Sequence, residues 1–294
     1  MKQRSVSELA TTARAFDRRL TPARADLAAA ALIGKVEASR FVEGWRRRII
    51  DAVAPLRQAP SHDASLETEA LFGESVTVYE ESEGWAWAQL LRDSYVGYLP
   101  ANALGPEAAP THRVAALRTF LYPRPSIKAP PLTALPMGAL VTVASTKGEF
   151  SALADVGFVY ARHLAGLDEF GGDFVAVAER FLEAPYLWGG RTSQGLDCSA
   201  LVQCALAAVG RAAPRDSDLQ EAALGAPVVF DENLGGLRRG DLVFWKGHVA
   251  IMRDEAVTIH ANGWHMKVVA EPLRLARDRI AQTEGATIRS IRRL

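Results

Sequence analysis

A helical pattern of apolar positions follows Cys198. Between residues 198 and 210, apolar side chains recur every three or four positions, and at 100° per residue they form one stripe: Leu201, Val202, Ala205, Leu206 and Val209. Cys198 lies within this stripe, whereas Gln203 marks the polar side. Gly210 is well placed to end the helix in a left-handed conformation. The pattern predicts a helix that begins at or near Cys198 and directs the thiol inward.

Two strand-like segments lie downstream, and each carries a histidine. Residues 240–252 contain two short apolar runs on either side of a glycine kink, and His248 opens the second run. Residues 256–262 alternate between two faces, one of which carries His260. A turn-like Arg-Asp-Glu sequence separates the two segments. We expect an antiparallel pair that brings both histidines to one face, under the helix.

The preceding part of the chain has short alternating runs that are typical of β-strands. In residues 71–104, the runs SVTVYE, WAWAQLL and YVGYLP are separated by turn sequences too short to hold a helix. This spacing predicts a small barrel. Residues 112–164 repeat the pattern more weakly, with the runs LRTFLYP, ALVTVAS, EFSALAD and GFVYARHL around a proline-rich loop. The similarity of the two segments suggests a diverged internal duplication.

These patterns predict an α+β protein with four parts. A basic, partly helical segment occupies residues 1–50, and its basic character reflects an excess of Lys and Arg in the first 60 residues. Two small β-barrels follow in residues 51–108 and 109–168. Residues 169–294 form the last part, in which the helix carrying Cys198 packs on an antiparallel sheet.

Composition narrows the possible partners and the compartment. The 294 residues carry a formal net charge of zero, which gives no reason to expect nucleic acid as a partner. The two cysteines stand six residues apart on one predicted helix, too far apart for a disulfide, so both should be free thiols in a reducing compartment. No secretory signal or membrane-spanning run is evident near the start. We therefore expect a cytoplasmic protein without a membrane partner, and the sequence does not predict its oligomeric state.

The arrangement of Cys198 and the two histidines points to thiol catalysis. Backbone N–H groups and the dipole at a helix start favour thiolate over thiol, so we expect the pKa of Cys198 to be lowered. His248 is the candidate base, and His260 is the candidate group that orients its imidazole. His265 has no further ligands at zinc-binding spacing, and this chemistry needs no metal or organic cofactor.

The same residues carry a family resemblance. Residues 173–294 resemble the NlpC-type cysteine peptidases, papain-related enzymes that cut peptides of bacterial cell-wall peptidoglycan, in the pieces PYLWGG, LDCSALVQ, GDLVFW, KGHVAIM and IHAN. The resemblance implies a papain-like domain with Cys198 as nucleophile, His248 as base and His260 as the third polar residue. It also implies substrate contacts from Tyr186, Trp188, Asp197 and Ser199. One departure is Ala200, where the family commonly has glycine.

Simpler roles remain open for the four predicted substrate contacts. Tyr186 and Trp188 could be core aromatic residues, which is the commoner role of such rings. Asp197 could serve only as a helix N-cap, and Ser199 could be an ordinary first-turn residue.

Both β-rich segments resemble bacterial SH3-like domains. In cytoplasmic relatives with this layout, the first such domain helps to close the active site and recognises the free amino terminus of a small peptide. The resemblance makes Glu74 the candidate partner of that ammonium group, with the ring of Tyr95 nearby. A glutamate at the start of a strand is more often simply solvated, so this alternative stays open.

Together these observations predict a cysteine endopeptidase acting on free cell-wall peptides in peptidoglycan recycling. The resemblance implies cleavage between γ-D-Glu and a diamino acid, either meso-diaminopimelate or L-Lys, in peptides with an unblocked N-terminal L-Ala. The expected partner is therefore a small peptide substrate. Two other classes remain open: a thiol amidase or acyltransferase on the same scaffold, and a non-catalytic protein that binds wall peptides.

Overall fold

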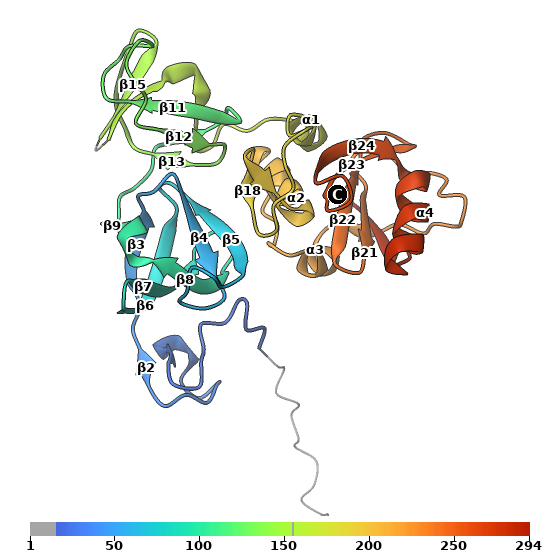
Figure 1. Cartoon of the computed structure of the whole chain (residues 1–294), viewed down its shortest axis with the longest axis horizontal. Coiled ribbons are helices and arrows are strands. Elements are labelled where there is room, and N and C mark those ends of the chain that lie inside the picture. Colours follow the sequence, from blue (N-terminus) through green and yellow to red (C-terminus); the bar gives the residue numbers. More distant parts are fainter. Residues whose placement is uncertain (1–15, 155) are drawn as a thin grey trace, which may run out of the picture.

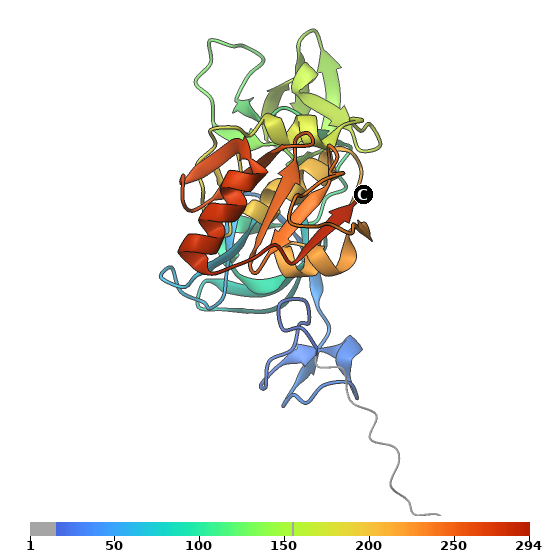
Figure 2. The ribbon, with the colours of Figure 1, turned by 90° about the vertical axis from the view of Figure 1, so that its right-hand side faces the viewer.

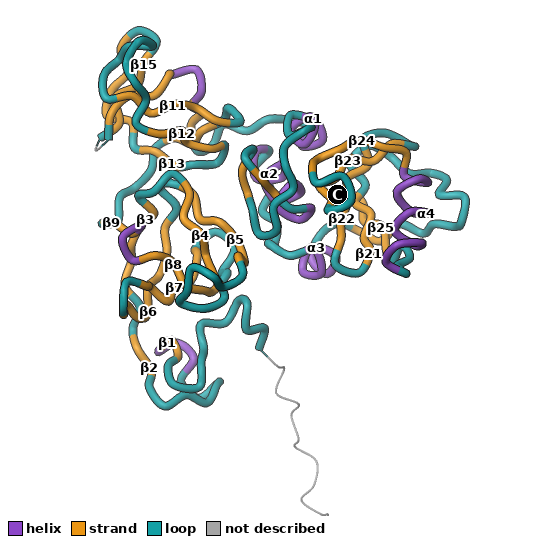
Figure 3. Tube along the Cα trace, in the orientation of Figure 1, coloured by secondary structure: helices purple, strands orange, loops and turns teal. Residues whose placement is uncertain are grey.

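The computed structural model describes residues 16–154 and 156–294 and arranges them as two β-rich domains beside an α+β domain (Figure 1). The first β-rich domain lies between the N-terminal segment and the second β-rich domain. In the view of Figure 2, the α+β domain faces the viewer and the first β-rich domain lies behind it. Figure 3 shows that the longer helices belong to the α+β domain.

The N-terminal segment is held mainly by extended backbone. Within residues 16–50 the elements before the first large sheet are β1 (Ala28–Ala29), the 3-10 turn η1 (Ala30–Leu32) and β2 (Phe41–Val42). The backbone N–H groups of Ala28 and Ala29 donate to carbonyl groups of Arg40 and Pro22, partners that an α-helix could not use. Within residues 16–50, helical structure is limited to the turn η1, and the partly helical character of segment 1–50 as a whole stays a prediction. Residues 1–15 lie outside the described residues.

A seven-stranded sheet forms the first β-rich domain, in the order β5-β4-β8-β7-β6-β3-β9. The predicted strands are confirmed as β6, β7 and β8. Strand β3 lies before residue 51, so the sheet begins inside the segment expected to precede it. The elements are β3 (Trp45–Ile49), β4 (Val53–Arg57), β5 (Leu66–Leu71), β6 (Ser75–Ser82), β7 (Trp85–Leu90), β8 (Val96–Pro100), the 3-10 turn η2 (Ala101–Ala103) and β9 (Leu104–Gly105).

The second β-rich domain contains a three-stranded sheet, β13-β10-β17, and a five-stranded sheet, β12-β11-β16-β15-β14. Its alternating strands enclose a small core that includes Val114, Leu135 and Val159. The predicted strand runs are present, and their SH3-like character stays a prediction. The elements are β10 (His112–Val114), β11 (Arg118–Tyr122), β12 (Thr133–Pro136), β13 (Leu140–Val141), β14 (Val143–Lys147), β15 (Phe150–Leu153), β16 (Gly157–Tyr160), the 3-10 turn η3 (Ala161–His163) and β17 (Leu164–Gly166).

The α+β domain is built on a six-stranded antiparallel sheet, in the order β20-β25-β21-β22-β23-β24. A separate two-stranded ribbon, β18-β19, precedes its main helix. The elements are α1 (Phe174–Glu179), β18 (Arg191–Thr192), β19 (Gly195–Leu196), α2 (Cys198–Ala208), α3 (Ser217–Ala223), β20 (Ala226–Pro227), β21 (Leu242–Trp245), β22 (His248–Met252), β23 (Val257–Asn262), β24 (Lys267–Pro272), α4 (Leu273–Glu284) and β25 (Ser290–Arg293).

Helices cover both faces of this sheet. In β21, Leu242 and Phe244 pack in the same core as α2, whereas Val243 and Trp245 pack in the core that contains residues of α4. All four side chains are buried, which explains why β21 reads as a continuous apolar run rather than an alternating one. Helix α2 contacts β22 and β23 directly, so the sheet fixes the start of α2 beside the two histidine-bearing strands.

Candidate active site

The start of α2 positions the Cys198 thiol. As the N-cap of α2, Asp197 accepts a hydrogen bond from the backbone N–H of Ala200 at 2.8 Å and another from the Ser199 hydroxyl at 3.1 Å. Cys198 is the first helical residue and is only 6% exposed. After the helix, Gly210 has a φ of 77°, as the sequence predicted for its end. The predicted helix and inward-facing thiol are thus both present.

On β22 and β23, the strands that contact α2, the two histidines form the beginning of a hydrogen-bonded chain. His248 Nε2 lies 2.7 Å from His260 Nδ1, and His260 Nε2 lies 2.8 Å from a carboxylate oxygen of Glu271. Because a carboxylate can only accept, His260 donates through Nε2 and its Nδ1 accepts from His248. This order leaves Nδ1 of neutral His248 free to accept a proton.

An ion pair that the sequence analysis did not identify ends this chain. Arg279 of α4 donates to both oxygens of Glu271, at 2.6 Å each. Although burial opposes ionisation, the hydrogen bonds from Arg279 and His260 lower the pKa of Glu271 to about 2. The signal that could have identified Glu271 is its place on the strand that pairs with the strand of His260. In that pairing, Thr258 stands opposite Glu271 and is two residues from His260 on the same face.

Burial keeps both reacting groups neutral in this structure. It raises the pKa of the Cys198 thiol to about 12, with the Asp197 carboxylate adding to the effect and the Val249 backbone N–H opposing it. Burial also lowers the pKa of His248 to about 3, assisted by His260. The expected lowering of the thiol pKa is therefore wrong for this structure, because desolvation outweighs the helix start. Thiol and imidazole face the reaction as a neutral pair.

Cys198 opens into a cavity of about 290 Å³ that three parts of the chain share. The structure brings the predicted Tyr95, Tyr186, Trp188, Asp197 and Ser199 to this cavity. Its other lining residues are Arg19, Glu67, Asp216, Ser217, Asp218 and Gly247, which directly precedes His248.

Exposure rules out a core role for Trp188, whereas Tyr186 both packs against the core of the domain and lines the cavity. Trp188 is 67% exposed, so it is not a core residue. Tyr186 is half-buried, and burial together with the nearby Cys198 raises the pKa of its phenol above the usual value. The Tyr186 hydroxyl therefore keeps its proton over the neutral range and remains a hydrogen-bond donor.

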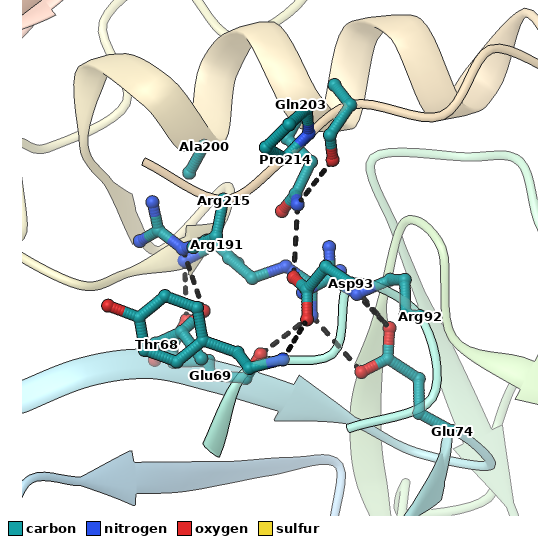
Figure 4. Close-up of polar contacts among 12 residues, drawn as sticks. Thr68, Glu69, Glu74, Arg92, Asp93, Arg191, Ala200, Gln203, Pro214 and Arg215 are labelled. Carbon is teal, nitrogen blue, oxygen red and sulfur yellow. Dashed lines mark hydrogen bonds and ion pairs between the residues drawn. The ribbon is translucent and has the colours of Figure 1, made fainter. Parts of the chain in front are cut away.

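Glu74 lies elsewhere, which corrects the prediction that it faces the substrate. Only 5% exposed, it lies 3.1 Å from Arg92 and 3.1 Å from Arg191 (Figure 4). It also accepts a hydrogen bond from the backbone N–H of Leu71 at 3.0 Å. Glu74 lines a different cavity, of about 420 Å³, together with Cys204. Because Arg191 belongs to the α+β domain, Glu74 is part of the contact between domains.

Besides Asp197, the carboxylates that reach the Cys198 cavity are Glu67 of β5, Asp216 at the N-cap of α3 and Asp218 of α3. The Tyr95 hydroxyl lies 3.0 Å from Asp216 and 3.3 Å from Glu67, and its single hydrogen can serve only one of them. An incoming cationic donor could satisfy the other. The strand reading from the sequence began at Leu71, so Glu67 in the alternating LETEAL run of β5 was missed.

Arg215 is the second important residue that the sequence analysis missed. It is 1% exposed and donates to both oxygens of Asp197, at 2.9 and 2.6 Å, and to the Ser199 hydroxyl at 2.9 Å. Its Nε–H donates to Thr68 of β5 at 2.7 Å (Figure 4). Asp197 is thus the helix N-cap that the simpler alternative proposed, and it is also one half of a buried ion pair. Arg215 ties the start of α2 to the first β-rich domain.

Residues 16–154 and 156–294 are the part of the chain that the structure describes. No group of three or more His, Cys, Asp or Glu side chains in these ranges is arranged to hold a metal ion. None of the helices in these ranges is long and apolar enough to cross a membrane. Cys198 and Cys204 are both free thiols, as predicted.

The fold and the site together define a papain-like domain, in which a cysteine-bearing helix packs on an antiparallel sheet with a histidine pair. Residues 183–280 match the NlpC/P60 family, and residues 56–104 match the bacterial dipeptidyl-peptidase Sh3 domain. The chain therefore carries an NlpC/P60 domain preceded by a bacterial SH3 domain. The SH3 match covers only the first β-rich domain.

Three similar proteins extend this result. Dipeptidyl-peptidase 6 of Lysinibacillus sphaericus is 26% identical over 239 residues, which cover 73% of this chain and 86% of the relative. A Gamma-D-glutamyl-L-lysine dipeptidyl-peptidase of Bacillus subtilis (strain 168) is 29% identical over 204 residues, or 62% and 65% of the two chains. The crystal structure of an NlpC/P60 family protein from Bacillus cereus ATCC 10987 matches with a TM-score of 0.69 and 21% identity, covering 85% of this chain and 99% of that one. The structural match shows a shared fold.

Proposed function

We propose that the protein is a cysteine endopeptidase that hydrolyses the bond between γ-D-Glu and a diamino acid in free cell-wall peptides with an unblocked N-terminal L-Ala. One observation supports the proposal: the cavity that contains Cys198 is also lined by acidic and phenolic side chains of the SH3 domain and by aspartates at the start of α3. The similarity to a Gamma-D-glutamyl-L-lysine dipeptidyl-peptidase of Bacillus subtilis supports the substrate class, and the similarity to Dipeptidyl-peptidase 6 of Lysinibacillus sphaericus supports peptidase activity.

The proposed chemistry begins with the neutral pair. As the Cys198 sulfur attacks the carbonyl carbon, Nδ1 of His248 takes the thiol proton, and a tetrahedral oxyanion forms. The Cys198 backbone N–H and the Tyr186 hydroxyl are the proposed donors to this oxyanion. His248 then gives its proton to the leaving amine as the carbon–nitrogen bond breaks, which leaves a thioester on Cys198.

Hydrolysis of the thioester reverses the roles. A water molecule loses a proton to His248 as its oxygen attacks the thioester, and the thiol regains that proton as the carbon–sulfur bond breaks. The imidazolium that forms in each half of the reaction is stabilised through His260 by the Glu271 carboxylate. Every proton is returned, so the cycle needs no other reactant than water.

Recognition of the substrate amino terminus is proposed for the acidic end of the cavity. Glu67, Tyr95 and Asp216 meet there, and an ammonium group can donate to the carboxylate that does not receive the tyrosine hydrogen. Asp197 and Ser199 lie between this end and the thiol in the proposed substrate path, and Trp188 stands at the exposed mouth. A requirement for free small peptides would fit a cytoplasmic role in peptidoglycan recycling.

The test is product analysis by mass spectrometry after incubation with L-Ala-γ-D-Glu-L-Lys and with the corresponding meso-diaminopimelate peptide. We expect release of L-Ala-γ-D-Glu and the free diamino acid, and no release by Cys198→Ala protein. Transfer of the acyl group to an added amine in preference to water would favour an acyltransferase. Release of ammonia without cleavage of the peptide bond would favour an amidase. Binding without any product would favour a wall-peptide binding protein.

A further inference from the structure

The N-terminal segment places an arginine against the acidic end of the candidate active site. Arg19 Nη1 donates to Asp216 at 2.7 Å and to Asp218 at 2.9 Å, and Nη2 donates to Asp218 at 2.8 Å. The remaining donors of Arg19 are engaged by Asp17, at 3.1 Å for Nε and 2.7 Å for Nη2. Three aspartates therefore use the whole guanidinium fork, and Arg19 keeps no free donor for a substrate.

Backbone contacts fix this arginine on the SH3 domain. The carbonyl of Arg19 accepts from the Val96 N–H at 2.8 Å, and the carbonyl of Leu20 accepts from the Gln89 side chain at 2.9 Å. The Leu20 side chain packs against the core of the SH3 domain. Arg19 thus starts from a fixed position on one domain and spans to Asp216 and Asp218 of the other.

The position of Arg19 matters because cavities lie on both sides of it. The Cys198 cavity, of about 290 Å³, and a second cavity of about 430 Å³ along the SH3 domain share three lining residues: Arg19, Glu67 and Tyr95. The second cavity continues past Gln58, Trp87 and Tyr98. The three shared residues form a partition between the two spaces.

We infer that Arg19 is a specificity-determining residue, the wall that ends the substrate cavity at the peptide's α-amino group. The inference rests on the proposed function. A residue attached to that amino group would have to pass through the partition into the second cavity. Passage requires Arg19 to release Asp216 and Asp218 together, which leaves two neighbouring carboxylates without their shared cation. Longer peptides are thus excluded by the ion pairs they would break, as well as by the space that Arg19 fills.

Two peptides that both have a free amino terminus test the wall separately from ammonium recognition. They are L-Ala-γ-D-Glu-L-Lys and Gly-L-Ala-γ-D-Glu-L-Lys, and the measured quantity is the ratio of their kcat/KM values. We expect wild-type protein to favour the shorter peptide, and Arg19→Ala to reduce that preference by roughly ten-fold or more through faster cleavage of the longer one. Because Arg19 lines the cavity and pairs with Asp216, the ratio of the two peptides, and not the rate for either one alone, is the readout.

A matched control is Arg239→Ala. Arg239 also joins two carboxylates, those of Asp173 and Glu179 at the two ends of α1. Its side chain is exposed to a similar degree but lies away from the cavity. Its loss should leave the peptide ratio unchanged. Thermal unfolding shows whether Arg19→Ala protein is folded. If it is not, Arg19→Gln provides the second variant, since it keeps much of the side-chain volume and removes the charge.

The outcomes separate this inference from the proposed function. A folded Arg19 variant whose peptide ratio stays within about two-fold of wild type overturns the wall while leaving the peptidase proposal intact. Two negative results together overturn both the wall and the peptidase proposal: wild-type protein does not cut the shorter peptide, and Cys198→Ala protein does not bind it in calorimetry. A reduced ratio in both Arg19 variants but not in Arg239→Ala supports the wall.

Discussion

The two walls of the candidate active site are built in different ways. The catalytic wall comes from neighbouring elements of one domain, with Cys198 at the start of α2 and both histidines on the adjacent hairpin. The recognition wall joins residues far apart in the chain: Tyr95 and Asp216 are 121 positions apart, and Arg19 and Asp216 are 197 positions apart. Catalytic geometry can therefore be specified by local sequence, whereas recognition depends on how the domains meet.

The two walls also differ in what holds them. The catalytic wall lies in a buried apolar core shared by α2, β21, β22 and β23, where desolvation controls the pKa values. The recognition wall is half-buried and is held by ion pairs that salt can weaken. We expect changes to the first wall to affect kcat and those to the second to affect substrate choice.

The largest effect should follow removal of the nucleophile. Cys198→Ala should lower kcat by roughly 10⁴-fold or more while leaving the fold intact, because only the attacking atom is lost. Cys204→Ala should retain most activity, since that thiol lines a different cavity. Steady-state kinetics and thermal unfolding check both variants. Turnover that survives loss of Cys198 would remove the catalytic wall from the proposal.

The second effect concerns the connection between the walls. Arg215→Ala leaves the Asp197 carboxylate without its buried cation, which should cost about 3–5 kcal/mol of unfolding free energy. Arg239→Ala, which breaks exposed ion pairs, should cost about 1 kcal/mol or less. Denaturant titration measures both. Equal stability of the two variants would mean that Arg215 does not anchor the helix start.

Sequence patterns could predict the catalytic wall because its spacing is periodic. The helix beginning at Cys198, the strands of His248 and His260 and the three SH3-domain strands all follow from local alternation. Glu67 and Arg215 could not be selected in the same way, because their partners Tyr95 and Asp197 lie 28 and 18 positions away along the chain and no local pattern encodes such a tertiary contact. The family resemblance made Glu74 the candidate partner of the substrate ammonium group, and only the structure reveals its two arginine partners.

The thiol pKa shows a second limit of sequence reasoning. The helix start was identified correctly, but its effect on the thiol is smaller than the effect of burial. Burial depends on α2 packing against the sheet, which a helical pattern alone does not measure. A local pattern also does not predict the backbone hydrogen bonds of residues 16–50, where the N–H groups of Ala28 and Ala29 donate to the carbonyl groups of Arg40 and Pro22.

The third prediction uses the buried histidine of the catalytic wall. His260 is fully buried, and burial lowers its pKa even though Glu271 opposes this. A lowered folded-state pKa means that its stabilising contribution is complete above the unfolded pKa of about 6.5 and is lost as the pH falls below that value. From pH 7.5 to pH 5, the unfolding free energy should therefore decline as the unfolded chain takes up a proton that the buried imidazole disfavours.

Variants isolate that contribution. His260→Gln should flatten the decline in unfolding free energy between pH 7.5 and pH 5, measured by denaturant titration at each pH. His62→Gln changes an exposed histidine and should leave the decline as in wild type. The Glu271 contribution is lost only at more acid pH, because its unfolded pKa is near 4.5. The same decline in wild type and His260→Gln would contradict the prediction.

The smallest effect should come from the recognition wall, where Glu67 takes the role that the sequence analysis assigned to Glu74. If Glu67 receives the substrate ammonium, free L-Ala-γ-D-Glu-L-Lys should be cut faster than its N-acetyl form, and Glu67→Gln should reduce that preference by roughly ten-fold, which corresponds to one charge-assisted hydrogen bond. Acetylation removes the charge without changing the scissile bond but also adds bulk next to Arg19, so the change in the kcat/KM ratio between wild type and Glu67→Gln, rather than the ratio itself, reports on this contact. Glu74→Gln should leave the ratio unchanged and lower stability instead, since it leaves Arg92 and Arg191 without their shared carboxylate. A reduced ratio in Glu74→Gln, with none in Glu67→Gln, would restore the original assignment and move the recognition wall to the other cavity.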